Sequence, residues 1–429
     1  MACHNRPMPA PHANTLPEFR LRVIPAIADV AREAWDACAN PNLHADLESK
    51  SQAAESNAQP VERTSLTESY NPFISHDFLY CLEASNSAVA RTGWQPQHLL
   101  LEGEDGAPLG AVPCYLKSHS RGEYVFDRGW AEAFEHAGGE YYPKLQVSVP
   151  FTPATGRRLL VRDNANAEAV RAALAAGLVE LCRRHQISSV HATFMPELEW
   201  RFLGERGFLQ RTDQQFHWSN AGYTTFDDFL SALAARKRKT IKRERREALE
   251  PGISVHWLTG SDLTEEVWDA FFAFYMETGA RKWGSPYLTR NFYSMVGERM
   301  RDRIVLIMAK RAGRYIAGAI NFIGSETLFG RHWGAIEHHP FLHVELCYYQ
   351  AIDFAIARKL ARVEAGAQGE HKLTRGYMPV TTYSAHYIAN PSLCRAVADY
   401  LVRERAHVEA FGEELAAAAP FRKNLVEQD

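Results

Sequence analysis

The sequence predicts an α/β protein of the α+β kind, built from two units that follow one another along the chain. The chain has 429 residues, more than the roughly 250–300 residues at which a single hydrophobic core usually stops growing. Its composition, 46% hydrophobic and 23% charged, is that of an ordinary globular protein. A strand–turn–strand pattern followed by a helical pattern occurs in both halves, so we expect two related units.

The first half contains a predicted hairpin followed by a predicted helix. Two apolar stretches, His98–Glu102 and Leu109–Leu116, flank the polar residues 104–106, and this arrangement is typical of two strands joined by a tight turn. Residues 167–185 then carry apolar side chains at the spacing of one helix face. The order of hairpin and helix is the unit that recurs further along.

The first half is expected to close with a strand, a short helix and a last strand. Ser188–Phe194 has the composition of a strand. A short helix should end at Gly207, because glycine accepts the backbone angles that release a helix, and Phe208 would fill the core behind it. The closing strand is predicted at Gln215–Ser219.

The second half repeats the order of the first. Ile304–Lys310 and Tyr315–Ile323 flank turn residues at 312–313, and apolar spacing predicts a helix over residues 343–360. A further strand, Leu328–Ala335, should lie between the hairpin and the helix. The two halves match in the order of their elements and only weakly in their residues.

Shifts in composition mark the expected domain limits. Within an N-terminal segment, 1–70, the stretch 40–69 is polar and nearly free of large apolar side chains, so we expect it to be disordered. The first unit is expected at 71–222 and the second at 253–429, which ends in a C-terminal helix. A basic helix at 223–252 would link them.

Charge, hydropathy and cysteine content exclude several classes of protein. The formal net charge is −3, so affinity for phosphates or nucleic acid must come from a local patch. No apolar run approaches the roughly 20 residues of a membrane helix, and the N-terminus lacks the apolar core of a secretory signal. The seven cysteines are scattered without a CxxC pair, which favours a reducing compartment. We expect a cytoplasmic protein.

The predicted linking helix, Thr225–Leu249, carries eight cations within the eleven residues 236–246. Like charges this close repel one another by a few tenths of a kcal/mol per pair. In one interpretation the helix contacts the phosphates of a nucleotide-linked substrate, a pyrophosphate lipid or tRNA, through side chains such as Arg238, Lys242 and Arg245. In the other it is a solvated connecting helix. The sequence favours neither.

The stretch Glu364–Pro379 is rich in glycine and in charged residues, which is unusual for a packing segment. Its polar side chains are those of Glu370, His371, Lys372 and Arg375. They fit acyl transfer, in which a general base takes a proton from an attacking amine and a cation stabilises the oxyanion. No serine elbow or Cys/His arrangement is evident, so direct attack by the amine is expected. A salt-bridged turn without a catalytic role is the alternative.

Two further groups of residues precede this loop. Arg331 and His332 are neighbours on a predicted strand and should point to opposite faces, so that one of them can face a cleft; solvation at the strand end is the alternative. The histidines at 338, 339 and 343 suggest a metal site, but Pro340 interrupts the helix that would align them. We expect no bound metal.

Several separated motifs, spread over about residues 71–400, carry a family resemblance. They are Asn71–His76, Thr92–Pro96, Tyr142–Gln146 with Val149–Pro153, Gly330–Gly334, and Gly366–Lys372 with Arg375–Tyr377. Together they resemble the FemAB-like family of N-acyltransferases. The resemblance implies two tandem GNAT-like units, each a mixed, mostly antiparallel sheet flanked by helices.

The resemblance also implies candidate substrates. The better-known members of the family transfer amino acids from aminoacyl-tRNA to the peptide of a peptidoglycan precursor, and the wider superfamily uses acyl-CoA. This chain lacks the long helical arm of some tRNA-dependent members. It also lacks the pyrophosphate loop of the acyl-CoA enzymes, which Arg331–Ile336 matches only in part. The donor is therefore open.

We thus expect an N-acyltransferase that moves an acyl or aminoacyl group from acyl-CoA or aminoacyl-tRNA to an amine of a small molecule or peptide, without a metal. The expected catalytic residues are Glu370, His371 and Lys372. The expected substrate contacts are Arg331, His332, Arg375, Tyr377, Arg238, Lys242 and Arg245. The alternative is a non-catalytic protein of the same fold that holds a phosphorylated ligand or RNA, such as tRNA, through its basic helix.

Overall fold

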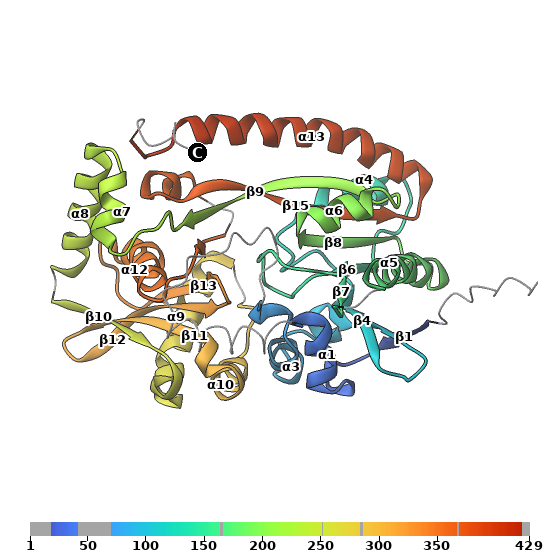
Figure 1. Cartoon of the computed structure of the whole chain (residues 1–429), viewed down its shortest axis with the longest axis horizontal. Coiled ribbons are helices and arrows are strands. Elements are labelled where there is room, and N and C mark those ends of the chain that lie inside the picture. Colours follow the sequence, from blue (N-terminus) through green and yellow to red (C-terminus); the bar gives the residue numbers. More distant parts are fainter. Residues whose placement is uncertain are drawn as a thin grey trace, which may run out of the picture.

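A computed structural model of the chain describes residues 19–41, 70–163, 166–250, 252–283, 286–366 and 369–422. Two sheets form its framework, and helices cover their faces (Figure 1). The stretch expected to be disordered, 40–69, lies outside the described residues from 42 onward.

The strands belong to a small and a large sheet. The small sheet has four strands in the order β1 (Arg20–Ile24), β3 (His98–Glu102), β4 (Pro108–Val112) and β7 (Leu160–Val161). The large sheet has eleven strands in the order β10 (Ile253–Leu258), β11 (Ile304–Arg311), β12 (Arg314–Ile323), β13 (Thr327–Ala335), β14 (Arg362–Glu364), β9 (Leu209–Ser219), β15 (Met378–Ile388), β8 (Ser189–Met195), β6 (Lys144–Val147), β5 (Cys114–Lys117) and β2 (Trp94–Pro96).

The helices flank these sheets. The α-helices are α1 (Arg32–Ala39), α3 (His76–Ala84), α4 (Arg128–His136), α5 (Ala167–Arg184), α6 (Glu197–Gly204), α7 (Phe226–Ala232), α8 (Ala235–Leu249), α9 (Glu265–Trp283), α10 (Arg290–Arg299), α11 (Leu342–Val344), α12 (Gln350–Ala357) and α13 (Pro391–Ala417). The 3-10 helices are η1 (Ile27–Asp29), η2 (Pro72–Ile74), η3 (Ala90–Thr92), η4 (Gly260–Asp262), η5 (Arg301–Arg303) and η7 (Glu370–Arg375), and η6 (Glu345–Tyr349) is a π-helix that joins α11 to α12. In the part of the chain described, no helix combines the length and apolar character needed to cross a membrane.

The repeated order expected from the sequence is confirmed. Strands β3 and β4 form the first hairpin and β11 and β12 the second. Each half contains one parallel pair of strands, β6 with β8 and β13 with β14, and the other described pairings are antiparallel. Both sheets are therefore mixed or antiparallel and flanked by helices, as predicted.

The two halves are joined through the large sheet, a feature that the sequence analysis did not include. Strand β15 comes from the second half, yet it lies between β8 and β9 of the first half. Strand β9 pairs in turn with β14 of the second half. A boundary near residue 222 thus divides the chain but does not divide the sheet. Helix α13 packs along β9 and β15 (Figure 1).

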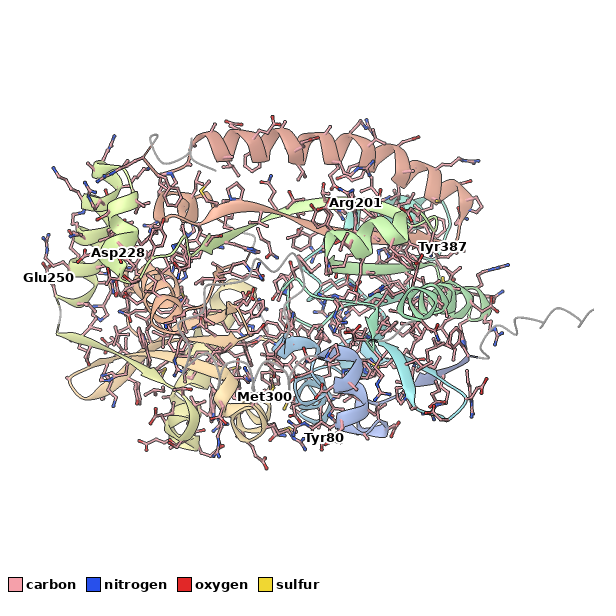
Figure 2. All side chains as sticks on the ribbon, in the orientation of Figure 1. Tyr80, Arg201, Asp228, Glu250, Met300 and Tyr387 are labelled. Carbon is pink, nitrogen blue, oxygen red and sulfur yellow. The ribbon has the colours of Figure 1, made fainter. Side chains whose placement is uncertain are left out.

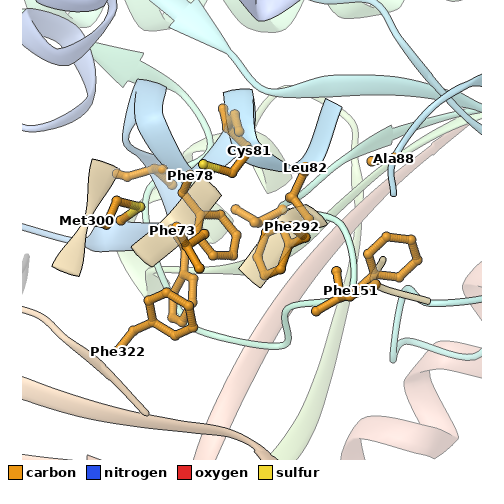
Figure 3. Close-up of a cluster of buried hydrophobic side chains, with 14 of the residues drawn as sticks. Phe73, Phe78, Cys81, Leu82, Ala88, Phe151, Phe292, Met300 and Phe322 are labelled. Carbon is orange, nitrogen blue, oxygen red and sulfur yellow. The ribbon is translucent and has the colours of Figure 1, made fainter. Parts of the chain in front are cut away.

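An aromatic core also connects the halves. Phe73 and Phe78 of the first half contact Phe322 of the second, with ring centroids 5.2 and 5.3 Å apart. Phe78 also meets Phe292 of α10 edge to face (Figure 3). Burial of each such ring contributes about 1.5–3 kcal/mol. Because both halves contribute rings, the halves stabilise one another.

The predicted basic helix is wrong in one respect, because Thr225–Leu249 forms two helices. The chain leaves the helical conformation at Leu233, whose ψ is 154°, and α8 begins at Ala235. Leu233 is fully buried, and the N–H of Ala234 donates to the carbonyl of Pro420 at 2.9 Å, so docking of the C-terminal segment accounts for the break. Helix α7 begins directly after its N-cap residue, Thr225, and Asp228 completes a capping box with that residue. Figure 2 shows Asp228 and Glu250 at this end of the molecule.

Candidate functional site

A cavity lies where two arms of the large sheet separate. Strand β13 pairs with β14 only through Thr327–Phe329, and β14 pairs with β9 only through His217–Ser219. Beyond these pairs a cavity of about 320 Å³ is lined by both arms. Its walls are Tyr124, Phe126, Pro153, Asp213, Tyr275, Thr278, Gly279, Pro286, Tyr287, Gly330, Arg331, His332, Trp333, His343, Ala365, Gly366 and Lys372. Both halves of the chain contribute to this main cavity.

Strand β13 is shaped by a bulge and by a close helix contact. Ile320 pairs with His332 and Asn321 with Gly330, so Arg331 is an extra residue without a partner on β12. Such bulges redirect side chains. Further along, a Cβ on Gly334 would lie 2.2 Å from backbone atoms of α9, so only glycine allows β13 to lie this close to the helix.

The bulge changes the expected orientation of Arg331 and His332. The sequence analysis placed them on opposite faces of a regular strand, but both line the main cavity. Arg331 donates a hydrogen bond to the carbonyl of Phe151 and another to Tyr124, both in the first half. Burial, followed by the charge of Arg331, lowers the pKa of His332 to about 3, so this imidazole is neutral at pH 7. The expected role in a cleft thus has a physical basis for both residues.

Lys372 lies at the point where the two arms meet. Its ammonium donates to the carbonyls of Ala365 at 2.6 Å and Gly366 at 3.0 Å. The main chain of Ala365 and Gly366 continues the pairing with Phe216 of β9. An ammonium has three donors, so one is left for a ligand in the cavity. Burial lowers the pKa of Lys372 to about 8, and the group is still mainly charged at neutral pH.

The other two predicted catalytic residues differ in position from Lys372. His371 is exposed, does not line the main cavity, and its Nε2 lies 3.1 Å from the hydroxyl of Tyr348. Burial, then Arg375 and Lys372, lowers its pKa. Glu370 begins η7, and its side chain is outside the part of the structure described, so its role as a base stays a prediction.

The three glycines that flank these residues have the expected backbone angles. Gly366, Gly369 and Gly376 have φ of 76°, 107° and 88°. Residues other than glycine rarely adopt such φ values. The glycines therefore shape the loop, as the sequence indicated, and the loop places Lys372 at the wall of the cavity.

Arg375 and Tyr377 are held by contacts inside the protein. Arg375 forms a two-pronged ion pair with Glu244 of α8, at 2.9 and 3.1 Å. Tyr377 is fully buried and donates to the carbonyl of Tyr348 at 3.1 Å. The structure gives Tyr377 a packing role in place of the expected substrate contact, because no surface of its side chain is open. Arg375 fastens η7 to α8 and borders a second groove.

The basic helix does not line the main cavity. Arg245 is bound by Glu345 at 3.0 Å and Asp353 at 2.6 Å, so it ties α8 to the neighbouring helix and is not free for a substrate. Lys242 is exposed and lies 3.3 Å from Asp227. Arg238 is half-buried. The structure thus separates the expected phosphate contacts from the residues around Lys372.

The main cavity continues into a wider groove of about 780 Å³. The two share Thr278, Trp333 and His343, and the groove extends past residues 335–344 at the start of α11. His339 in this groove contacts Glu337 at 2.9 Å. No group of three or more His, Cys, Asp or Glu side chains that could hold a metal occurs among the described residues.

Sequence analysis missed several wall residues. Tyr124, Phe126 and Asp213 come from the first half, and no motif marked them. Asp213 belongs to β9, which was expected to start only at Gln215 and in fact starts at Leu209. Tyr275 of α9 accepts the N–H groups of two residues in the following loop, at 3.0 and 3.1 Å, and meets His332 edge to face.

Comparison with known proteins places this chain in a family. A family model for peptidoglycan biosynthesis/recognition, FemAB-like, matches residues 26–423. The chain therefore belongs to the FemAB-like family, and this membership supports a transferase. No curated protein matches the chain significantly.

Solved structures with a similar fold have low sequence identity. The crystal structure of FemX is 12% identical, covers 74% of this chain and 93% of its own, and has a TM-score of 0.48. A tandem GNAT protein from the clavulanic acid biosynthesis pathway is 14% identical, with 87% and 99% covered and a TM-score of 0.43. L-PGS from Bacillus licheniformis is 9% identical, with 79% and 99% covered and a TM-score of 0.46.

Proposed function

We propose that this protein is an N-acyltransferase that joins an acyl or aminoacyl group to an amine in the main cavity. The observation that carries the proposal is the buried ammonium of Lys372, fixed by two carbonyls and facing a cavity between the halves. A preorganised cation of this kind stabilises the oxyanion that forms when a carbonyl is attacked. Membership of the FemAB-like family supports the same reaction class.

In the proposed reaction the amine nitrogen attacks the carbonyl carbon of the donor directly. The new C–N bond forms, the carbonyl oxygen takes the negative charge beside Lys372, and the leaving group departs with the electron pair of the broken bond. The leaving group is the thiolate of CoA or the ribose hydroxyl of tRNA. The amine proton passes to a base, for which Glu370 remains the candidate. The described cavity walls contain no serine or cysteine to form a covalent intermediate.

We propose further that the two connected spaces serve the two substrates. The donor would lie in the wider groove beside residues 335–344 and reach past Trp333, and the acceptor would occupy the main cavity. A peptidoglycan precursor is a proposed acceptor, in accord with the family description. All six cysteines of the described residues are free thiols, which keeps a cytoplasmic location as our expectation.

The experiment is a thermal-shift screen of acyl-CoAs, aminoacyl-tRNAs and muramyl peptides, followed by mass spectrometry of the amide product. A ligand at 100 times its dissociation constant stabilises the folded protein by about 2.7 kcal/mol. The product should form with the wild type and be nearly lost with Lys372→Met. Product formation at the wild-type rate by the Lys372→Met variant would contradict the proposal.

A polyanion-binding protein without catalysis is the second candidate, and one observation favours it. Ion pairs engage Lys242, Arg243, Arg245 and Arg246 in the C-terminal part of α8. In contrast, residues 236–239, all Arg or Lys, have no ion-pair partner within the described chain, and two of them line an open depression of about 400 Å³. Retention of tRNA with steep salt dependence, and no product from any donor, would favour this candidate.

A further inference from the structure

One carboxylate stands out in the main cavity. Asp213 is the sole aspartate or glutamate among the described residues that line it, and the cations Arg331 and Lys372 line it as well. A cavity with separate positive and negative groups suits a ligand that carries opposite charges or dipoles at its two ends. The negative group has no place in the reaction as described so far.

The position of Asp213 follows from the strand register. Phe329 of β13 and His217 of β9 both pair with Glu364, so these two residues mark the same level of the sheet. Asp213 lies four residues beyond His217, and Trp333 lies four residues beyond Phe329 on the other arm. At about 3.3 Å per residue, both lie roughly 13 Å from the point where the arms meet. Asp213 and Lys372 therefore belong to different ends of the cavity.

Asp213 forms no ion pair with a cation of the described chain. The nearest charged neighbour on the strand, Arg211, is held by both carboxylate oxygens of Glu404, at 2.8 and 2.6 Å. One oxygen of Asp213 accepts the N–H of Gln214 at 2.7 Å, which leaves the second oxygen for a ligand. Asp213 is exposed to the cavity and to solvent; desolvation by the surrounding walls raises its pKa, and the N–H of Gln214 and the charge of Arg211 offset part of this rise.

Aromatic rings share the cavity with Asp213. Tyr124 and Phe126 line it from the loop before α4, and 60% of Phe126 is exposed. An ammonium is attracted to the faces of aromatic rings, and an alkyl stem packs favourably against them. A lone carboxylate beside such rings provides the recognition chemistry of an alkylammonium group.

We propose that the acceptor is an aliphatic diamine, that Asp213 binds the ammonium at its far end, and that its alkyl stem contacts Phe126. The assignment of this diamine as the acceptor rests on the proposed acyl transfer. Asp213 would hold the protonated amine at one end of the cavity, while the second amine, in its neutral form, attacks the donor carbonyl whose oxygen lies beside Lys372 at the other end. The same geometry excludes neutral alcohols of equal length, because they offer no charge to Asp213.

The test uses the full chain, 1,5-diaminopentane as the charged probe and 1,5-pentanediol as its neutral counterpart. Dissociation constants are measured by NMR titration at pH 7. We expect the wild type to bind the diamine and not the diol, and Asp213→Asn to weaken diamine binding at least tenfold. Asp399→Asn, which changes an exposed aspartate on α13, is the matched control and should bind as the wild type does. Equal binding of the diamine by Asp213→Asn and the wild type would overturn the proposal.

A second variant and a second readout make the outcome decisive. Phe126→Ala should fold, since the ring is exposed, and should weaken diamine binding several-fold; unchanged binding would contradict the aromatic contact. If no donor yields a product but diamine binding still depends on Asp213, the proposed reaction fails and the ammonium site stands. If a product forms and Asp213→Asn leaves the KM for the amine unchanged, the reaction stands and the ammonium site fails.

Discussion

Each half of the molecule contains one place where two parallel strands separate, and the two places differ in what fills them. In the first half, beyond the pairing of β6 with β8, the guanidinium of Arg158 donates to the carbonyls of Thr193 and Ala154, at 2.7 and 2.9 Å. Only 1% of Arg158 is exposed. In the second half the corresponding space is the main cavity, and Arg331 lines it. The same strand arrangement is thus closed in one half and open in the other.

The buried lysines show the same difference. Lys144 on β6 has all three ammonium donors occupied, by Ser120 at 2.8 Å, Glu123 at 2.7 Å and Asp127 at 2.5 Å. These three residues belong to the loop that carries Tyr124 and Phe126 into the main cavity. Lys372 has two donors occupied and faces the cavity. The comparison teaches that the buried lysine of the first half holds a loop of the cavity wall in place, while the buried lysine of the second half keeps a donor free for the cavity.

The largest expected effect concerns the two arginines. Arg158→Met should lower the free energy of unfolding by about 3–5 kcal/mol, because it leaves buried carbonyls and the nearby carboxylate of Glu199 without their cation. Arg331→Met should lower it by about 1 kcal/mol, since its place is partly open to a cavity. Urea unfolding of both variants measures the difference. Equal losses of unfolding free energy in the two variants would contradict the view that the opening in the first half is closed and the opening in the second half is a cavity.

Substitution of Lys372 should affect chemistry more than stability. Lys372→Met should reduce kcat by about 10²–10³-fold, the effect typical of losing one oxyanion donor. The same substitution removes the hydrogen bonds to the carbonyls of Ala365 and Gly366, and this loss should lower the free energy of unfolding by roughly 1–2 kcal/mol. Single-turnover kinetics and urea unfolding separate the two effects. A loss of stability with a normal rate would mean that the loop is only structural, which was the alternative reading of its sequence.

The sequence was informative about the loop and less so about the walls of the cavity. Its glycines and Lys372 could be recognised because their residue types restrict backbone and charge locally. The shared sheet could not, because β15 inserts beside β9 through pairing between residues far apart in the chain. Asp213 was missed for the same reason. The strand β9 extends back to Leu209 only because it pairs with the distant strand β15. The sequence analysis placed Arg331 and His332 on opposite faces, because side chains alternate along a regular strand. The bulge that brings both into the cavity could not be read from the sequence.

The pH dependence of turnover provides a further test of Lys372. Its folded-state pKa of about 8 lies below the ordinary value of 10.5. Turnover should therefore decline as pH rises through about 8, when the ammonium loses its charge. Stability should change in the opposite sense, because from about pH 8 to 10.5 the unfolded state binds more protons than the folded state. Both trends should be absent from Lys372→Met, as shown by pH profiles of kcat and of urea unfolding.

A smaller effect is expected at the contact between the halves. Tyr124→Phe removes the hydrogen bond to Arg331 and keeps the ring in the cavity wall. Loss of one such bond costs about 1 kcal/mol, so the KM for the amine should rise several-fold with little change in kcat. Steady-state kinetics measures this split. A fall in kcat alone would indicate that Tyr124 acts on the reacting atoms and does not position Arg331.

The smallest effect on turnover is expected at α8, because its free cations lie away from the cavity. Reversal of two of them, Arg236→Glu with Lys239→Glu, should leave kcat with a small acyl donor unchanged and alter stability by less than about 0.5 kcal/mol. If the helix contacts a nucleic acid, the slope of log K against log salt should fall by about 1–2. Arg183→Glu on α5 is the control, since this exposed cation lies on another helix. An unchanged slope would leave α8 as a solvated connector, and a loss of kcat with the small donor would contradict the separation of helix and cavity.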